Sequence, residues 1–431
     1  MERTTVSELR TRIGQQVCVK GFVEAIREHK ERLFIVIRDR TGSVQVLSER
    51  EGSPTEAIVM DLTRESAVVV TGLVIDNPQV RLGGLEIVLE TLQVVGAAAA
   101  PLPLETTGRS RPGVEHRLDW RHLDLRRPEM RRVFEIQTLV ERAMRRFWEA
   151  EGLIEIHAPK LMGTASESGA ELFGLDYFDT TAYLAQSPQF YKQMAIAAGF
   201  EGVFEIGPVF RAEPSFTTRH TTEFTSVDVE ISWVDSHEDV MVFEERWMHA
   251  VLEEVSGCAG GTEVNVPTLP FPRISHAAAV EIARTRQPGW EPSASGDLDP
   301  AGERLVARHA AEELGHEFVF VTDYPVSVRP FYHMRHPSAP ELTRSFDLLW
   351  KGIEITTGAQ REHRIEILEA QATEKRLGLD GLASYLGFFR FGCPPHGGFG
   401  FGLARMLMVL LDQPSVRETT LLPRTPNRLV P

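Results

Sequence analysis

Apolar and polar residues alternate along five short runs near the start of the chain. The runs are QVCVKGFVEAI, RLFIVIRD, GSVQVLS, AVVVTGLVI and LEIVLETLQVV, and all lie within residues 15–95. Alternation with a period of two residues predicts strands with one buried face, and turn residues separate the runs. One helical stretch, over residues 54–64, interrupts them. This order predicts a small Greek-key β-barrel in a first domain of residues 1–100.

The pattern changes after the predicted barrel. GAAAAPLPLETTGRSRPGV is rich in Ala, Pro and Gly, so residues 101–130 are predicted to be a linker. A second domain, residues 131–431, is expected to begin with an amphipathic helix over residues 131–150. Apolar residues recur there at helical spacing, at Val133, Ile136, Val140, Ala143 and Phe147.

Residues 203–231 form the most informative segment. Alternating apolar residues predict two strands, and the polar loop between them holds Arg211, Glu213, Arg219 and His220. A hairpin tip on a surface is usually short and built on Gly or Asn. A long charged loop between two apolar strands therefore indicates a binding site, and the alternative is a solvated loop at a sheet edge.

Two later segments indicate anion and metal chemistry. GGFGFGLARMLMVLL, residues 397–411, is a glycine run that opens into an apolar helix, where Arg405 and the helix N-terminus would attract anions. Tight helix–sheet packing would explain the glycines equally well. Asp347 and Glu354 are seven residues apart across a Lys-Gly turn, so adjacent antiparallel strands would point both carboxylates at one spot. With the hydroxyl of Thr357 they suit Mg²⁺ that bridges phosphates, and a salt-bridge ladder is the alternative.

Composition restricts the function classes. The 431 residues allow two or three domains, and 42% hydrophobic and 25% charged residues are ordinary for a globular protein. The first residues contain no apolar core of a signal peptide, and the chain has no run of 18 apolar residues, so a cytoplasmic protein with no membrane partner is expected. Its three cysteines are far apart and suggest neither a disulfide framework nor a cysteine zinc site. The net charge of −15 means that a nucleic acid would need local basic patches.

Several segments together resemble one enzyme family. The loop in residues 203–231 and the glycine run of residues 397–411 resemble motifs 2 and 3 of the class II aminoacyl-tRNA synthetases. LIEIHAPKLM resembles motif 1, and FIVIRDRTGSVQ resembles part of the anticodon-binding barrel of subclass IIb. Over residues 15–431 the chain is similar to the aspartyl-tRNA synthetases of the compact, archaeal-like type. This resemblance implies an α+β fold, in which an N-terminal OB-fold barrel is joined to a catalytic domain built on an antiparallel β-sheet flanked by helices.

The resemblance implies ATP-dependent ligation of L-aspartate to tRNA(Asp) through an aspartyl adenylate, in a homodimer that uses Mg²⁺. Arg211, Glu213 and Arg405 are implied as catalytic residues. The implied ATP-binding residues are Arg211, Glu213, Arg219, His220, Thr221, Phe224, Glu354, Gly402, Leu403, Ala404 and Arg405, and the implied metal ligands are Asp347, Glu354 and Thr357.

For the amino acid, the resemblance implies binding by Glu167, Gln189, Lys192, Arg211, Thr357 and Arg361. Glu167 lies in a segment that closes over the substrate in the family. A buried lysine facing a neutral amide would be an unpaired charge, so Lys192 favours aspartate over asparagine. Arg361 would add a planar fork of donors to the substrate carboxylate.

The barrel residues bear on the choice of tRNA. OB barrels bind single strands by stacking bases on aromatic side chains and hydrogen-bonding their edges. The resemblance implies that Phe34, Gln45 and Glu86 contact the anticodon, and the alternative for Phe34 is a place in the barrel core. His29 and Pro78 lie in two barrel loops, and relatives that aspartylate both tRNA(Asp) and tRNA(Asn) tend to carry His and Pro there. We therefore predict relaxed specificity that feeds a tRNA-dependent amidotransferase.

Three other functions stay open. Asparaginyl-tRNA synthetase is the nearest, and Lys192 opposes it. An ammonia-dependent asparagine synthetase shares the catalytic fold and adenylate chemistry, but it lacks a barrel like that of residues 15–95. A non-catalytic OB binding module would not need Arg211, Glu354 and Arg405 together.

Overall fold

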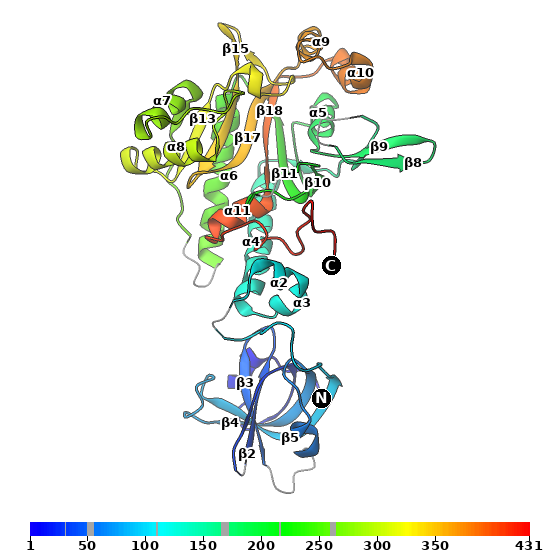
Figure 1. Cartoon of the computed structure of the whole chain (residues 1–431), viewed down its shortest axis with the longest axis vertical. Coiled ribbons are helices and arrows are strands. Elements are labelled where there is room, and N and C mark those ends of the chain that lie inside the picture. The colour runs from blue at the N-terminus through cyan, green and yellow to red at the C-terminus, as the bar shows by residue number, and fades with distance from the viewer. Residues whose placement is uncertain (31, 50–55, 109–110, 165–171, 215–216, 259–263) are drawn as a thin grey trace. The chain divides into compact units, whose positions relative to one another are not determined.

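The computed structural model describes residues 1–30, 32–49, 56–108, 111–164, 172–214, 217–258 and 264–431. These residues form two compact units, Met1–Gly113 and Val114–Pro431 (Figure 1). Within the described ranges, none of the helices is both long enough and apolar enough to cross a lipid bilayer.

The first unit is a closed barrel. Its strands pair in the order β1-β2-β3-β5-β4 and are β1 (Gln16–Glu28), β2 (Arg32–Arg38), β3 (Ser43–Glu49), β4 (Ala67–Asp76) and β5 (Leu85–Gly96). β3 and β5 pair in parallel, whereas the other neighbours are antiparallel. A 3-10 helix, η1 (Val6–Arg12), precedes β1, and α1 (Glu56–Met60) lies in the predicted helical stretch. The predicted OB-type barrel is confirmed.

Strand alternation fills the barrel interior. On β2, Leu33, Ile35 and Ile37 are fully buried in the barrel core, and Val44 and Val46 of β3 join them. The residues between them point outward, because successive side chains of a strand lie on opposite faces.

The second unit is built on an eight-stranded sheet in the order β12-β13-β16-β17-β18-β11-β10-β6. These strands are β12 (Arg273–Ser275), β13 (Phe318–Thr322), β16 (Ser345–Trp350), β17 (Ile353–Arg361), β18 (His396–Gly402), β11 (Glu223–Ser232), β10 (Gly202–Phe210) and β6 (Ile154–Glu155). The six central strands are antiparallel, as predicted, and only the edge pairings β12–β13 and β6–β10 are parallel.

Helices and smaller sheets surround this sheet (Figure 1). The helices are α4 (Pro128–Ala150), α5 (Gln189–Ala197), α6 (His237–Cys258), α7 (His276–Arg286), α8 (Pro300–Glu313), α9 (Ile365–Glu374), α10 (Leu379–Gly387) and α11 (Leu403–Leu410), with 3-10 turns η2 (Val326–Val328) and η3 (Phe388–Phe391). The remaining strands are β7 (Leu161–Met162), β8 (Gly174–Tyr177), β9 (Thr180–Leu184), β14 (Arg335–His336) and β15 (Ala339–Thr343).

Aromatic side chains join two helices to the sheet. Trp148 of α4 stacks on Trp247 of α6 with ring centroids 5.4 Å apart. Trp247 in turn lies 5.5 Å from Phe399 and 5.4 Å from Phe401 of β18. All four are almost completely buried, and full burial of one such side chain stabilises the fold by roughly 1.5–3 kcal/mol. This core fixes the position of β18.

Two short helices precede α4, namely α2 (Val114–Asp119) and α3 (Arg121–Asp124). Arg117 donates to Glu418 at 2.9 Å and to Asp124 at 3.2 Å, and Arg121 donates to Asp124 at 2.7 Å. These buried charges are paired inside the second unit. The second unit therefore begins inside the segment of residues 101–130 that the sequence predicts as a linker.

Candidate active site

A cavity of about 340 Å³ lies in the second unit. Most of the residues that the sequence nominates for ATP and aspartate line it, although they come from four separate stretches of the chain. They are Gln189, Lys192, Arg211, Glu213, Arg219, His220, Thr221, Phe224, Glu354, Thr357, Arg361, Gly402, Ala404 and Arg405.

The glycine run makes room for this cavity. On β18, Phe399 and Phe401 pack toward Trp247, so the alternate residues Gly398 and Gly400 face the other side of the sheet. A Cβ atom on Gly400 would lie 2.7 Å from Oδ1 of Asp228, and one on Gly398 would lie 2.4 Å from a carboxylate oxygen of Glu230. Any larger residue would displace these carboxylates, so the glycines serve close approach and not only tight packing.

The loop between β10 and β11 presents Arg211 over an aromatic ring. The backbone N–H of Arg211 donates to Thr222 at 2.9 Å, which continues the hairpin one residue beyond the strand. Its guanidinium carbon lies 5.4 Å from the ring centroid of Phe224, and its Nη1 lies 3.9 Å from Oε1 of Glu213. The Arg211 side chain is 41% exposed, so its charge is available to a ligand.

Arg405 joins the helix after the glycine run to β17. Its Nη1 donates to the backbone carbonyl of Glu354 at 2.9 Å, and its Nη2 lies 3.5 Å from Nε2 of His220. Burial and the neighbouring Arg405 lower the pKa of His220 to about 4. His220 is therefore neutral near pH 7, and its contact with Arg405 is a hydrogen bond and not an ion pair.

A β-bulge brings Glu354 and Thr357 together. The register of β16 and β17 shifts between Leu348 and Leu349, and the hydroxyl of Thr357 donates to Oε1 of Glu354 at 2.9 Å. Burial opposes ionisation of Glu354, but Arg405 and this hydroxyl outweigh it and lower its pKa. An ionised carboxylate and a hydroxyl thus face the cavity together.

Asp347 lies opposite Thr357 on β16, but the cavity-lining residues do not include it. Its Oδ2 forms an ion pair with Nη2 of Arg329 at 2.7 Å, while its buried Oδ1 has no hydrogen-bond partner among the described residues. Burial and the Glu354 carboxylate raise the pKa of Asp347 in spite of Arg329. The two predicted carboxylates thus lie on neighbouring strands, and Asp347 has Arg329 as an unforeseen partner.

Lys192 and Arg361 meet at one carboxylate, Glu230 of β11. Nζ of Lys192 lies 3.2 Å from Glu230 and 3.0 Å from Asp228, and Nε of Arg361 lies 3.0 Å from Glu230. All four side chains are buried. The argument that Lys192 would be an unpaired charge without a substrate carboxylate is therefore wrong, because Asp228 and Glu230 neutralise it within the fold.

The remaining nominated residues of this unit lie elsewhere. Leu403 is buried in the hydrophobic core behind the cavity, and Glu167 lies outside the described residues. Gln189 begins α5, one turn before Lys192, and both line the cavity as their spacing predicts.

The structure adds side chains that the sequence analysis missed. They are Asp228 and Glu230 on β11, and Arg329, Tyr332 and His333 after β13. Ser226, Asp228 and Glu230 alternate with Val227 and Val229 along one strand, so the period of two in SVDVE was a usable signal. Arg361 also lies 3.0 Å from Nε2 of His333, which no sequence spacing indicates.

Gln45 and Glu86 lie on the outward face of the barrel, where neighbouring side chains bury Glu86. Gln45 and Glu86 are paired across β3 and β5, and Nε2 of Gln45 donates to Glu86 at 3.0 Å. Nδ2 of Asn77 donates to the other oxygen of Glu86 at 2.8 Å.

Phe34 alternates with core residues of β2 and is half-buried, so it belongs to the outer face and not to the barrel core. Its ring lies 6.0 Å from that of His29 in an edge-to-face arrangement. Pro78 follows Asn77 in the connection between β4 and β5.

Comparison with known proteins defines the class. The profile of the tRNA synthetases class II (D, K and N) matches residues 113–426, and that of the OB-fold nucleic acid binding domain matches residues 17–95. The chain therefore belongs to the class II tRNA synthetase family.

Relatives lie close in sequence and structure. The chain is 43% identical to the aspartate–tRNA(Asp) ligase of Pyrococcus abyssi over 97% of both chains. It is 42% identical to the aspartate–tRNA(Asp/Asn) ligase of Aeropyrum pernix, over 97% of this chain and 96% of the relative. The structure of the asparaginyl-tRNA synthetase of Pyrococcus horikoshii complexed with asparaginyl-adenylate is similar with a TM-score of 0.92, at 31% identity and over 100% of both chains.

Proposed function

We propose that this chain ligates L-aspartate to tRNA(Asp), and also to tRNA(Asn), through an aspartyl adenylate. The observation that carries the proposal is identity of about 40% to curated aspartate–tRNA ligases over nearly the whole length of both chains. The cavity supports it, because cationic and acidic groups from separate elements converge there in the pattern that the family motifs predict.

In the first step, ATP and aspartate occupy the cavity side by side. An oxygen of the aspartate α-carboxylate attacks the α-phosphorus, the bond to the bridging oxygen breaks, and pyrophosphate leaves. Arg211 binds the α-phosphate, Arg405 and neutral His220 bind the distal phosphates, and Phe224 offers its ring to adenine. Catalysis then rests on positioning and charge stabilisation, and no protein nucleophile takes part.

The residues present fit a divalent cation. Glu354 and Thr357 offer a carboxylate and a hydroxyl on the cavity wall, and Asp347 has a buried oxygen without a hydrogen-bond partner among the described residues. Hard oxygen donors of this kind suit Mg²⁺. When bound there, Mg²⁺ would neutralise charge on the ATP phosphates.

Lys192 and Arg361 are proposed to bind the side-chain carboxylate of aspartate. Within the fold their charges are balanced by Asp228 and Glu230, so selection rests on the placement of donors and not on a free positive charge. Lysine offers only donors, and an amide NH₂ group facing it would lack an acceptor. This favours aspartate over asparagine, which is the alternative substrate.

In the second step, the 3′-hydroxyl of the terminal tRNA ribose attacks the adenylate carbonyl, and AMP leaves. The outer face of the barrel is proposed to hold the anticodon, with Phe34 stacking on a base and Gln45 and Glu86 hydrogen-bonding base edges. Such an enzyme acts in the cytoplasm, where translation consumes its product.

The chain is also proposed to form a homodimer through the segment of residues 153–162. Ile154 and Leu161 support this, because they are 50% and 48% exposed and lie within the segment that resembles motif 1. Size-exclusion chromatography with light scattering tests it: twice the mass of 48.3 kDa is expected, and a single-chain mass would contradict it.

His29 and Pro78 favour relaxed tRNA specificity. Curated relatives include both aspartate–tRNA(Asp) and aspartate–tRNA(Asp/Asn) ligases at similar identity, so overall similarity does not decide between them. An enzyme that charges tRNA(Asn) with aspartate would require a tRNA-dependent amidotransferase to convert the product.

Two assays test the proposal in order. Exchange of pyrophosphate into ATP should depend on aspartate and not on asparagine, and dependence on asparagine would reverse the choice of substrate. Aspartylation of tRNA(Asp) and tRNA(Asn) transcripts at one salt concentration should then give comparable rates. Charging of tRNA(Asp) alone would leave the ligase assignment intact and refute the argument from His29 and Pro78.

A further inference from the structure

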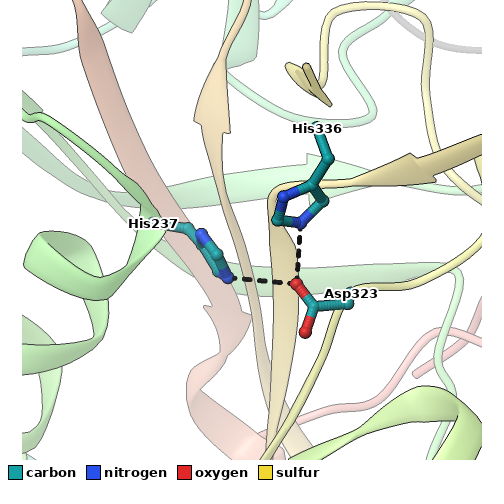
Figure 2. Close-up of side chains that lie close together, drawn as sticks. All are labelled: His237, Asp323 and His336. Carbon is teal, nitrogen blue, oxygen red and sulfur yellow. Dashed lines mark hydrogen bonds and ion pairs between the residues drawn. The ribbon is translucent and has the colours of Figure 1, made fainter. Parts of the chain in front are cut away.

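Three side chains from three different elements point at one spot outside the cavity. His237 is the first residue of α6, Asp323 follows β13, and His336 ends β14. Figure 2 shows both imidazole rings directed at the same carboxylate oxygen of Asp323. Nε2 of His336 lies 2.8 Å from this Oδ1 atom, and Nε2 of His237 lies 3.4 Å from it.

The spacing of these atoms suits one small cation. One ligand atom from each residue lies within 4.8 Å of the other two. In a tetrahedral site with bonds of about 2.0–2.1 Å, two ligand atoms are separated by about 3.4 Å. The His237–Asp323 separation has this value. The His336–Asp323 separation is 2.8 Å, so these two atoms would move apart only slightly to bind the ion.

We propose that His237, Asp323 and His336 form a binding site for a divalent transition-metal ion, with Zn²⁺ as the best match. Two imidazole nitrogens and one carboxylate oxygen are a mixed donor set that Zn²⁺ accepts. Mg²⁺ prefers oxygen donors alone, so this site is chemically distinct from the one around Glu354. A water molecule would complete four-coordination. The proposal does not depend on the ligase activity.

Neighbouring residues orient the proposed metal ligands. The hydroxyl of Thr322 donates to the second oxygen of Asp323 at 2.7 Å, which orients the carboxylate and leaves Oδ1 toward the histidines. Nδ1 of His237 is buried and has no hydrogen-bond partner among the described residues, so Nε2, which faces Oδ1 of Asp323, is the nitrogen offered to the ion.

A bound ion would fix a turn that leads to the cavity. Asp323 has a left-handed backbone with φ of 60°, and the next residue, Tyr324, packs under the guanidinium of Arg329 at 3.7 Å. Arg329 lines the cavity and pairs with Asp347. The ion would therefore join α6, β13 and β14 at the base of the segment that supplies Arg329.

The competing explanation is a triad held by hydrogen bonds alone. Calorimetric titration of Zn²⁺ into chelator-treated full-length protein distinguishes a metal site from such a triad. Excess Mg²⁺ is present to occupy oxygen-ligand sites. We expect one Zn²⁺ per chain and a higher melting temperature with Zn²⁺ than without it. Co²⁺ should give the intense visible absorption of a four-coordinate site.

Two variants test the ligands, and one serves as control. His336→Ala and Asp323→Asn should each weaken Zn²⁺ binding by at least about tenfold, because loss of even an outer partner of a ligand typically costs that much. Asn tolerates a left-handed backbone, so the Asp323→Asn variant keeps the test valid if the His336→Ala variant folds poorly. His309→Ala replaces a half-buried histidine of α8 outside the cluster and should bind as the native chain does. The proposal would be overturned if the native chain bound no Zn²⁺. It would also be overturned if a folded His336→Ala or Asp323→Asn variant bound Zn²⁺ with the native affinity.

Discussion

Glu303 of α8 accepts a hydrogen bond from the guanidinium of Arg219 at 2.6 Å, between Oε2 and Nη1. Both side chains are mostly buried, and the same carboxylate oxygen lies 3.4 Å from the backbone nitrogen of Glu354. Glu303 thus joins the loop after β10 to β17, at the wall of the cavity. An arginine proposed to bind ATP is held in place by a residue from a part of the chain without any recognised motif.

We predict that Glu303→Gln raises the KM for ATP in pyrophosphate exchange by about tenfold, equivalent to about 1.4 kcal/mol, with little change in kcat. The amide can still accept a hydrogen bond, but it cannot form the ion pair that orients Arg219 before ATP binds. Steady-state kinetics over a range of ATP concentrations measure both constants.

The surface pair Arg286–Glu312 supplies the control for this experiment. Its Nη1–Oε2 distance is also 2.6 Å, but the Glu312 side chain is 55% exposed. Glu312→Gln on the same helix should leave both constants unchanged. A Glu303→Gln variant that keeps the native KM would show that Glu303 has no part in positioning Arg219.

Removal of the Lys192 charge should affect both stability and aspartate use. Lys192→Met leaves Glu230 with Arg361 as its ion-pair partner, and it leaves Asp228 without an ion-pair partner among the described residues. Breaking a buried pair by removing one partner costs about 3–5 kcal/mol. We expect a drop of this size in the free energy of unfolding, measured with urea, together with at least a tenfold rise in the KM for aspartate.

Lys160→Met separates the two effects. Lys160 pairs with the buried Glu205 at 2.7 Å but does not line the cavity, so this variant should lose stability and keep the native KM for aspartate. An unchanged KM in the Lys192→Met variant would remove Lys192 from the aspartate site.

Sequence patterns predicted the elements of this site better than their contacts. The alternation in residues 203–231 located β10, β11 and the loop, and the glycine run located β18 and α11, because strand and helix periods are local properties. The pairing of Lys192 and Arg361 with Glu230 joins three elements, and only the register of the sheet brings them together. Sequence spacing therefore supported a wrong argument about the charge of Lys192.

The bulge in β17 shows a second limit of spacing. Residues three apart on a regular strand face opposite sides, yet Glu354 and Thr357 are hydrogen-bonded. The register shift between Leu348 and Leu349 permits this, and no turn residue marks it in the sequence. The cluster of His237, Asp323 and His336 likewise depends on contacts between elements that are far apart in the chain.

A buried acid behind the cavity should make stability depend on pH. The hydroxyl of Thr356 donates to Glu244 of α6 at 2.5 Å, and burial raises the pKa of Glu244 to about 8. The folded chain therefore keeps this proton over a pH range in which the unfolded chain, with an ordinary carboxyl pKa of 4.5, releases it. Because the folded state binds more protons there, this group lowers stability as pH rises from about 4.5 to about 8.

We predict that Glu244→Gln removes this dependence. The neutral amide cannot ionise, so the free energy of unfolding should fall less between pH 5 and pH 8 in the variant than in the native chain. Urea unfolding at several pH values measures the difference. Glu253→Gln, at an exposed position of α6, is the control and should follow the native profile. Parallel profiles for the native chain and the Glu244→Gln variant would mean that Glu244 is already ionised in the folded protein.

Glu86 provides a test of the barrel that leaves the cavity untouched. Its two oxygens accept hydrogen bonds from Gln45 at 3.0 Å and Asn77 at 2.8 Å, so the carboxylate has a fixed orientation on the outer face of the barrel. A fixed acceptor of this kind suits recognition of a base edge, because a mobile side chain would lose entropy on binding.

We predict that Glu86→Ala lowers kcat/KM for aspartylation of tRNA by about 10- to 100-fold, the cost of one specific base contact. Aspartate-dependent pyrophosphate exchange should stay at the native rate, because the cavity residues all belong to the second unit. Glu90→Ala, at an exposed position of the same strand β5, controls for the loss of a negative charge and should aspartylate normally. Equal loss in exchange and aspartylation would instead indicate damage to the fold, and native aspartylation by the Glu86→Ala variant would remove this carboxylate from anticodon recognition.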